Sequence, residues 1–295
     1  MDGRAALAVL VGAALIGLAP IGVRLSDIPP VATNMWRFIF ALPILAVLAT
    51  QGKQGTARDR GLLLIAGVFF AVELSLWAAS LTKTTVANAT LLTNMTPIFA
   101  ALFGWLLLKE KIAKGVLAGG AVALTGAVLL AIGRSHAAAG PAGDDGWIGD
   151  ALATSSALGY AAYLLMVRAI GSRVGVGGVM FWAGLSGVAV TFVLALILRE
   201  PLLPHSLQGW LILVGLGVVT QVGGQGLIAY GVGRLPILVS TVLLWMQPLA
   251  AAVLSWIIFG EALGPIAFLG AALILAGLFV VQRARAAPPP AAKTQ

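Results

Sequence analysis

Long runs of apolar residues follow one another through the chain, and they constrain its fold more than any other feature. Each run has about 20 residues, the length at which a helix crosses the hydrocarbon core of a bilayer. Charged residues make up only 9% of the 295 residues, whereas soluble domains have about 25%. Helices that are apolar on every side need lipid or other helices around them. The sequence therefore predicts an all-α integral membrane protein.

We count ten such runs, separated by turn and charge signals. They are 5–24, 31–50, 61–81, 84–108, 114–133, 149–170, 176–198, 207–231, 236–259 and 264–282. The first is interpreted as a membrane helix rather than a signal peptide, because further apolar runs follow at once. The longest connector divides the runs into two groups of five. The predicted organisation is a first five-helix repeat (1–134), a noncytoplasmic connector (135–148), a second repeat (149–285) and a disordered tail (286–295).

The positions of Lys and Arg predict the orientation of the helices. With the N-terminus in the cytoplasm, 13 of the 18 Lys and Arg fall on the cytoplasmic side and four on the other side, while Arg37 lies inside a run. Cytoplasmic loops of membrane proteins carry such an excess, and a miscounted helix would mix the two sides. The pattern favours ten crossings with both termini in the cytoplasm.

An internal repeat appears when the chain is compared with itself at a shift of 151 residues. The identities are Pro97/Pro248, Trp105/Trp256, Glu110/Glu261, Gly119/Gly270, Gly126/Gly277 and Arg134/Arg285. Because each repeat has five helices, the second enters the membrane from the opposite side, and the two are inverted repeats. Secondary transporters are often built this way, with the substrate site near the midplane between the repeats.

The chain resembles the drug/metabolite transporter superfamily, in its ten-helix EamA-type branch, and is similar to the exporters of aromatic and neutral amino acids. The resemblance is carried by Trp36-Arg37-Phe38, Asn94-Met95-Thr96-Pro97, Trp105, Lys109-Glu110-Lys111, Gln247-Pro248, Trp256 and Gly260-Glu261. It implies a cavity lined by the first four helices of each half, with the fifth helix of each half at the periphery. It also implies export of amino acids or related metabolites.

Glu73 is the acidic residue that lies deepest inside any run, and Trp77 follows one helical turn later on the same face. Ionisable groups inside a membrane are costly and are usually functional. Glu73 could bind a substrate ammonium or take part in proton coupling. The alternative is a glutamate that only holds helices together.

Two amides, Gln221 and Gln225, lie four residues apart in the run that is the repeat mate of the Glu73 run, among several glycines. They could contact substrate, with the glycines allowing the helix to unwind, or they could join helices through hydrogen bonds. Their two interpretations remain equally open.

Two prolines at matching places in the repeats predict kinked helices. Pro97 follows Asn94, and Pro248 follows Trp245 and Gln247. Proline frees a carbonyl and kinks a membrane helix. We assign Pro97 and Pro248 to gating, and the polar and aromatic residues before them to substrate binding, with plain packing as the alternative.

Aromatic residues deep in the runs predict one wall of the site. Tyr160 and Tyr163, with Trp77 and Trp245, could surround an apolar or aromatic group or a cation. Arg37 is assigned a gating or structural role, with its side chain reaching the interface or pairing with a carboxylate such as Asp27. Glu261 is interpreted as structural, accepting hydrogen bonds from the N-terminus of the helix that follows it.

Several functions are not supported by any motif in the sequence. There is no P-loop, no HExxH and no GxSxG, so we expect no ATP-driven pump, no enzyme, no metal site and no cofactor. Cys is absent as well. A membrane enzyme or a sensor without transport is the least favoured class.

The sequence therefore predicts a secondary transporter in a bacterial plasma membrane that exports amino acids with apolar or aromatic side chains. The predicted mechanism is alternating access between the repeats, with downhill transport that is not coupled to an ion. Proton-coupled efflux of cationic drugs and uptake of a metabolite are the alternatives. The expected partners are the substrate and the lipid bilayer, without nucleic acid, and the protein is expected as a monomer or weak homodimer.

Overall fold

The structure is a computed structural model that describes residues 3–109, 114–134, 145–170, 173–232, 234–235 and 243–286. The described chain is almost entirely helical. Its helices are α1 (Gly3–Gly17), α2 (Ala19–Leu25), α3 (Pro30–Thr50), α4 (Ala57–Ser80), α5 (Val86–Thr93), α6 (Thr96–Leu108), α7 (Lys114–Arg134), α8 (Gly146–Ile170), α9 (Val176–Ile197), α10 (Leu207–Gly215), η2 (Leu216–Gly224), α11 (Gln225–Val232), α13 (Met246–Phe259) and α14 (Pro265–Ala286).

Nine of the ten predicted runs each coincide with one helix or with one interrupted helix, and the described part of the run 236–259, from residue 243 on, contains α13. Seven stretches of the described chain are long and apolar enough to cross a membrane, judged by length and composition, while α7 and α13 contain shorter apolar stretches. The 25 residues of α8 are not among the seven. The all-helical membrane architecture is confirmed, and ten crossings stays a prediction. Glu110, most of the predicted connector and the tail after Ala286 lie outside the described residues.

Prolines interrupt three of the helical runs. As predicted, α6 begins just before Pro97 and α13 begins just before Pro248, so both runs break at matching places. The third break was not predicted: α1 ends at Gly17 and α2 begins at Ala19, with Pro20 in its first turn. Proline has no N–H to donate to the preceding turn, which explains why the helix restarts there.

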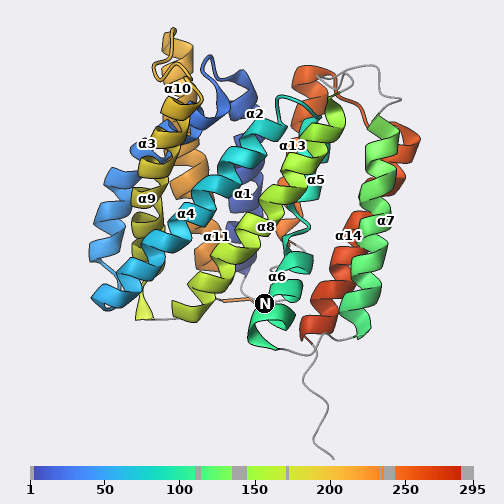
Figure 1. The fold of residues 1–295 in the computed structure, drawn as a ribbon, viewed down its shortest axis with the longest axis horizontal. Helices are drawn as coiled ribbons and strands as arrows, with labels where there is room; N and C mark the ends of the chain where they lie inside the picture. The colour runs from blue at the N-terminus through green and yellow to red at the C-terminus, as the bar shows by residue number, and fades with distance from the viewer. Residues whose placement is uncertain are drawn as a thin grey trace, which may run out of the picture.

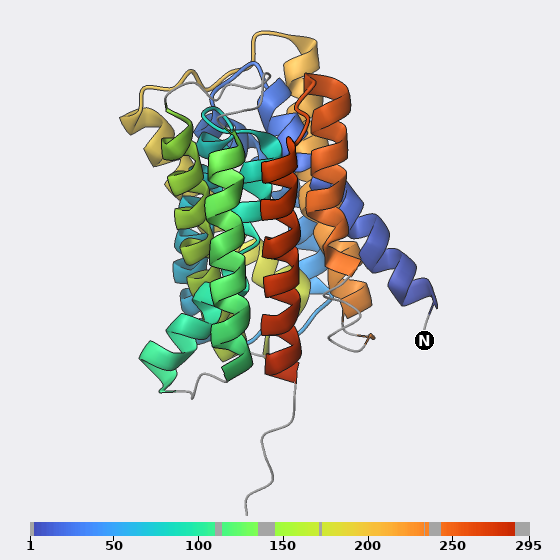
Figure 2. The ribbon, with the colours of Figure 1, turned by 90° about the vertical axis from the view of Figure 1, so that its right-hand side faces the viewer.

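Figure 1 shows the helices running between the two ends of a single bundle, with α7 and α14 side by side at one edge. In Figure 2 these two helices lie at the front, nearly parallel to each other. Their contact is close because glycines face each other: a Cβ at Gly119 would lie 2.6 Å from the carbonyl oxygen of Gly277, and one at Gly126 would lie 2.6 Å from that of Gly270. Small residues permit such close backbone approach in membranes.

The run 207–231 begins as α10, widens into the π-helical segment η2 and continues as α11. Its glycines let α1 approach, since a Cβ at Gly224 would lie 3.2 Å from the carbonyl oxygen of Gly12. Wide π-helical turns often occur at functional sites. The glycine-rich stretch thus serves both helix contact and a local change of helical pitch.

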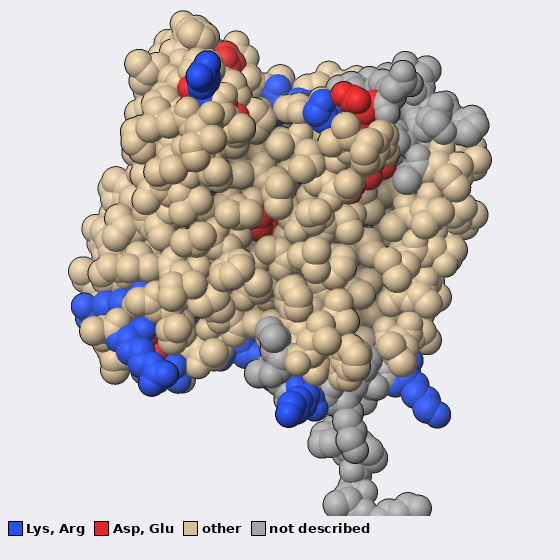
Figure 3. All heavy atoms as spheres, in the orientation of Figure 1, with Lys and Arg blue, Asp and Glu red and all other residues tan. Residues whose placement is uncertain are grey.

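The surface has an apolar middle and charged ends. Figure 3 shows a broad band without Lys or Arg, and Lys and Arg gather at the end of the bundle where α1 begins and α14 ends. This is the distribution that the positive-inside rule describes. The protein is a multi-pass membrane protein, and the cytoplasmic position of this end stays a prediction.

Candidate functional site

A cavity of about 550 Å³ lies inside the bundle, bordered by helices from both predicted halves. Small-molecule sites in proteins commonly have about 300–1,000 Å³. The family resemblance implied that the last helix of each half stays at the periphery. Instead, α14 contributes Leu278 and Gln282 to the wall.

Nine of the twelve residues predicted to bind substrate or to gate line this cavity. They are Glu73, Trp77, Asn94, Tyr160, Gln225, Trp245, Gln247, Arg37 and Pro97. The other three lie outside the lining: Tyr163 stacks on Tyr160, Gln221 accepts a hydrogen bond from Arg37, and Pro248 is buried in α13. Sequence spacing placed them on the correct helices, but tertiary packing decides which members of a helix face reach the cavity.

Glu73 lies in the middle of α4 and faces the cavity, with 5% of its surface exposed. Its Oε2 atom is buried and has no hydrogen-bond partner in the described part of the chain. Gly159 allows α8 to pack here, since a Cβ at that position would lie 3.0 Å from the Cβ of Glu73. A buried polar atom without a partner is costly, so Glu73 is better suited to meeting a ligand than to joining two helices.

Arg37 lies deeper in the bundle than we predicted. Because α3 begins at Pro30, Arg37 is about two turns into the helix and is only 3% exposed. Its Nε donates to Oε1 of Gln221 at 3.0 Å. The predicted pairing with Asp27 is wrong, because that carboxylate accepts from the backbone N–H groups of His205 and Ser206.

The aromatic wall is built around Phe70, which was not predicted. Its ring stacks on Tyr163 with centroids 4.8 Å apart and lies 6.2 Å from Tyr160. Phe70 and Tyr160 line the cavity, while Tyr163 supports them from behind. A signal for Phe70 was present in the sequence, since it precedes Glu73 by about one turn of the same helix.

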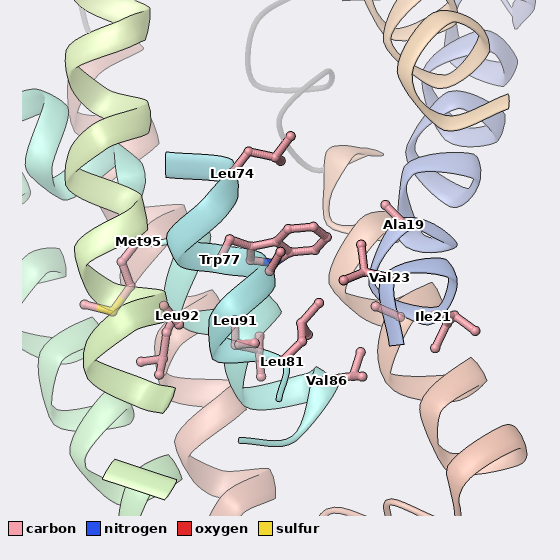
Figure 4. Packing of buried hydrophobic residues seen from close by; sticks show 14 of the residues in the cluster. Ala19, Ile21, Val23, Leu74, Trp77, Leu81, Val86, Leu91, Leu92 and Met95 are labelled. Atoms are coloured by element: carbon pink, nitrogen blue, oxygen red, sulfur yellow. The ribbon is translucent and has the colours of Figure 1, made fainter. Parts of the chain in front are cut away.

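Trp77 closes the wall on the side of α2. Figure 4 shows its indole extending from α4 toward Ala19 and Val23, and 7% of the residue is exposed. On the other side of the cavity, Trp245 packs edge-on against Phe279, with ring centroids 6.0 Å apart. The two tryptophans come from different halves of the chain, so both halves supply aromatic surface.

The break between α5 and α6 presents polar groups to the cavity. The side-chain amide of Asn94 donates at 2.7 Å to the carbonyl oxygen of Thr90, which also accepts from the backbone N–H of Asn94. Pro97 cannot donate to the carbonyl oxygen of Thr93, and the hydroxyl of Thr96 donates to it instead at 2.8 Å. Thr90, Thr93 and Thr96 line the cavity as well. Thr90 and Thr93 were missed, although their spacing before Asn94 and Pro97 marks one helical face.

A polar network lies beyond the cavity, at the end of the bundle opposite the N-terminus. Arg24, at the end of α2, forms an ion pair with Glu261, and it also donates to the carbonyl oxygens of Leu81 and Thr84 at 3.1 and 3.0 Å. Glu261 accepts from Ser255 at 2.5 Å and from the backbone N–H of Val86 at 3.0 Å.

This network corrects our prediction for Glu261. The predicted donor was the N-terminus of the following helix, α14, but the donor is the N-terminus of α5, from the other half of the chain. At the opposite end, the cavity wall reaches Ile228 and Gln282, each four residues before the end of its helix. The network therefore closes one end of the cavity, while the other extends toward the end that carries the N-terminus.

Helices with an apolar outer surface and a polar, aromatic central cavity define the class of membrane proteins that bind small molecules within the bilayer. The model of the EamA-like transporter family matches residues 3–132 and 147–283. The chain belongs to the EamA family of transporters, within the drug/metabolite transporter superfamily.

Three relatives have transporter names. A protein named a probable terminal-alkyne amino-acid exporter, from Streptantibioticus cattleyicolor, is 30% identical, and the match covers 66% of this chain and 64% of that relative, less than two thirds of its length. The uncharacterized transporter YetK of Bacillus subtilis is 25% identical, covering 94% of this chain and 84% of that protein. An uncharacterized transporter of Archaeoglobus fulgidus is 26% identical over 94% of this chain and 95% of its own length.

The fold also matches a solved crystal structure with a TM-score of 0.61, which covers 95% of this chain and 96% of that one at 19% identity. At this identity the similarity concerns the fold alone.

Proposed function

We propose that the protein exports amino acids with apolar or aromatic side chains across a bacterial plasma membrane. One observation carries the proposal: the carboxylate of Glu73, whose buried Oε2 atom has no hydrogen-bond partner among the described residues, faces a cavity whose lining includes four aromatic side chains, Phe70, Trp77, Tyr160 and Trp245. A carboxylate binds an ammonium group, and the rings of Trp77, Tyr160 and Trp245 suit an apolar side chain. The name of the Streptantibioticus relative supports the choice of amino acids.

In the proposed mechanism, the two halves of the chain move relative to each other around the bound substrate. The breaks before Pro97 and Pro248 supply points at which helices can bend. Among the described lining residues, Glu73 is the only acid, which favours downhill transport without a coupled ion.

Efflux of cationic drugs is the competing proposal, because a carboxylate among aromatic rings also suits a cation. Arg37 lies in the wall of the same cavity, and its positive charge disfavours a ligand that carries only positive charge. A zwitterion meets no such conflict.

The test is counterflow into liposomes that contain the purified protein. The lumen is loaded with the twenty amino acids, and the movement of each is followed with and without a pH gradient. Saturable movement of leucine- or phenylalanine-like amino acids, unchanged by the gradient, is the expected result. Movement of lipophilic cations but of no amino acid would overturn the proposal, and dependence on the gradient would replace downhill transport by proton coupling. Secretion from intact cells that express the protein tests the direction.

A further inference from the structure

Two charged side chains of the described chain line the cavity, Arg37 and Glu73, and they do not pair directly with each other. No N···O distance of 4.0 Å or less joins these two side chains, both of which belong to the described part of the chain. They come from neighbouring helices, α3 and α4. The two groups therefore interact electrostatically across the cavity wall without forming a direct ion pair.

The guanidinium of Arg37 is held in place but not saturated. Its Nε donates to Oε1 of Gln221 at 3.0 Å, which attaches one edge of the group to η2. Its Nη1 is buried and has no hydrogen-bond partner among the described residues. Only 3% of the surface of Arg37 is exposed. An ordered, water-excluded N–H without an acceptor is a binding position for an anionic oxygen.

Arginine matches a carboxylate better than other cations do, because its planar N–H groups can donate to both carboxylate oxygens. A purely structural arginine would be expected to satisfy its donors within the protein, since an unpaired buried charge costs much more than a paired one. Holding η2 through Gln221 uses the Nε donor, while Nη1 has no acceptor among the described residues and Arg37 belongs to the lining of the cavity.

We propose that Arg37 is the carboxylate-binding residue of the substrate site and that Glu73 binds the ammonium group, which makes zwitterionic α-amino acids the substrate class. The inference rests on the proposed function and adds to it the group that recognises the second charge of the substrate. It changes the role of Arg37 from gating to substrate recognition. Nonpolar surface from Phe70 and Trp77 then receives the side chain.

The test compares three ligands that share one side chain: phenylalanine, phenylalaninamide, which lacks the carboxylate, and N-acetylphenylalanine, which lacks the ammonium group. If counterflow identifies another amino acid as the better substrate, its amide and acetyl derivative take their place. Transport in liposomes is measured for the wild-type protein and for Arg37→Gln, Arg37→Lys, Glu73→Gln and Gln221→Leu.

Wild-type protein is expected to favour the amino acid over its amide by at least about tenfold, which corresponds to about 1.4 kcal/mol. Arg37→Gln should remove this preference while keeping the preference over the acetyl derivative. Glu73→Gln should do the reverse. Gln221→Leu serves as the control for the structural role, because it removes the partner of Nε and leaves the charge, so most of the preference for the carboxylate should remain.

Equal loss of transport for the amino acid and its amide in Arg37→Gln would overturn the inference and leave the proposed function intact. If wild-type protein moves no amino acid, the proposed function fails first. If Arg37→Gln does not elute as a folded protein, Arg37→Lys is the deciding variant. A retained but weaker preference for the carboxylate supports the inference. An unchanged preference contradicts the need for the planar N–H groups of arginine.

Discussion

The two halves of the chain contribute different chemistry to one cavity. Residues 3–134 supply both charged groups, Arg37 and Glu73, whereas residues 145–286 supply the amides Gln225, Gln247 and Gln282. The stretches α4 and 207–232 hold matching places in the predicted repeats, yet α4 is a regular helix and the other contains η2. A repeated scaffold can thus carry the mechanical symmetry of a transporter, while recognition depends on residues that only one half possesses.

The largest expected effect concerns the ion pair that joins the two halves at the closed end. Glu261→Gln leaves Arg24 without its counter-charge in a site where the two side chains are 14% and 2% exposed. Breaking such a pair costs about 3–5 kcal/mol, so the melting temperature of the purified protein should fall clearly.

The control is Lys83→Gln. Lys83 pairs with Asp145 at 3.1 Å, but these side chains are 39% and 64% exposed, and exposed pairs contribute about 0–1 kcal/mol. A similar, small change in both variants would show that the Arg24 network does not hold the halves together.

The next largest effect distinguishes the charged lining residues of the first half from the amide lining residues of the second half. Glu73→Gln should lower counterflow about 100-fold, because a hydrogen bond to a charged group contributes about 1.5–3 kcal/mol. Gln225→Leu should lower it about tenfold or less, since a neutral bond contributes about 0.5–1.5 kcal/mol. Equal losses of transport in the two variants would mean that both halves contribute equally to substrate recognition. Restored transport in the double variant Glu73→Gln with Gln225→Glu would show that the carboxylate can come from either half of the chain.

A smaller effect is expected where α7 and α14 meet. The substitution Gly119→Ala places a Cβ 2.6 Å from the carbonyl oxygen of Gly277, whereas Gly120→Ala meets nothing closer than a methyl of Ile98 at 3.8 Å. Overpacking costs about 1–3 kcal/mol, so thermal stability should fall for Gly119→Ala and stay level or rise for Gly120→Ala. The reverse order would contradict the close helix contact.

The smallest effects concern two acidic residues, each of which accepts hydrogen bonds at the start of a helix in the other half of the chain. Asp27 accepts from Ser206 at the start of α10, and Glu200 accepts from the backbone N–H of Ala32 at 2.8 Å in the first turn of α3. Desolvation alone raises the pKa of Asp27, but these hydrogen bonds outweigh it and bring the pKa below its ordinary 3.8. Burial raises the pKa of Glu200 above its ordinary 4.5, against the opposing hydrogen bond from Ala32.

The two acids should therefore respond oppositely to pH. A lowered pKa stabilises the fold above the ordinary value of 3.8 and the benefit is lost as the pH falls through the lowered pKa, so Asp27→Asn should lower the melting temperature at pH 7 and should lower it progressively less as the pH falls below 3.8. A raised pKa has the opposite sign, so Glu200→Gln should raise the melting temperature slightly at pH 7 and leave it unchanged near pH 4. Parallel pH profiles for the two variants would refute the assignment.

Much of the fold could be predicted because lipid imposes a simple rule on length and polarity. The apolar runs located the helices, and the prolines located the breaks before Pro97 and Pro248. The break at Pro20 was missed because the first run has no gap in its hydrophobicity. Arg37 was placed too near the surface because the distance of a residue from a run's end does not show which way its side chain points.

The candidate site was less predictable for a related reason. Glu73 and Gln225 stand out by polarity alone, whereas Tyr163 differs from Tyr160 only in which neighbour covers it. One donor to Glu261, the backbone N–H of Val86, lies at the start of α5, 175 residues earlier in the chain. Pairings across such a distance depend on how the helices assemble, and local patterns carry no information about them.

The two opposite charges in the cavity wall also bear on how the protein responds to the membrane potential. Moving one elementary charge across 100 mV involves about 2.3 kcal/mol. With Arg37 and Glu73 both charged, the wall has no net charge, and an amino-acid zwitterion adds none. On the proposed binding mode, the cavity wall has no net charge whether it is empty or holds the zwitterion, so the membrane potential should have little effect on the speed of the transport cycle.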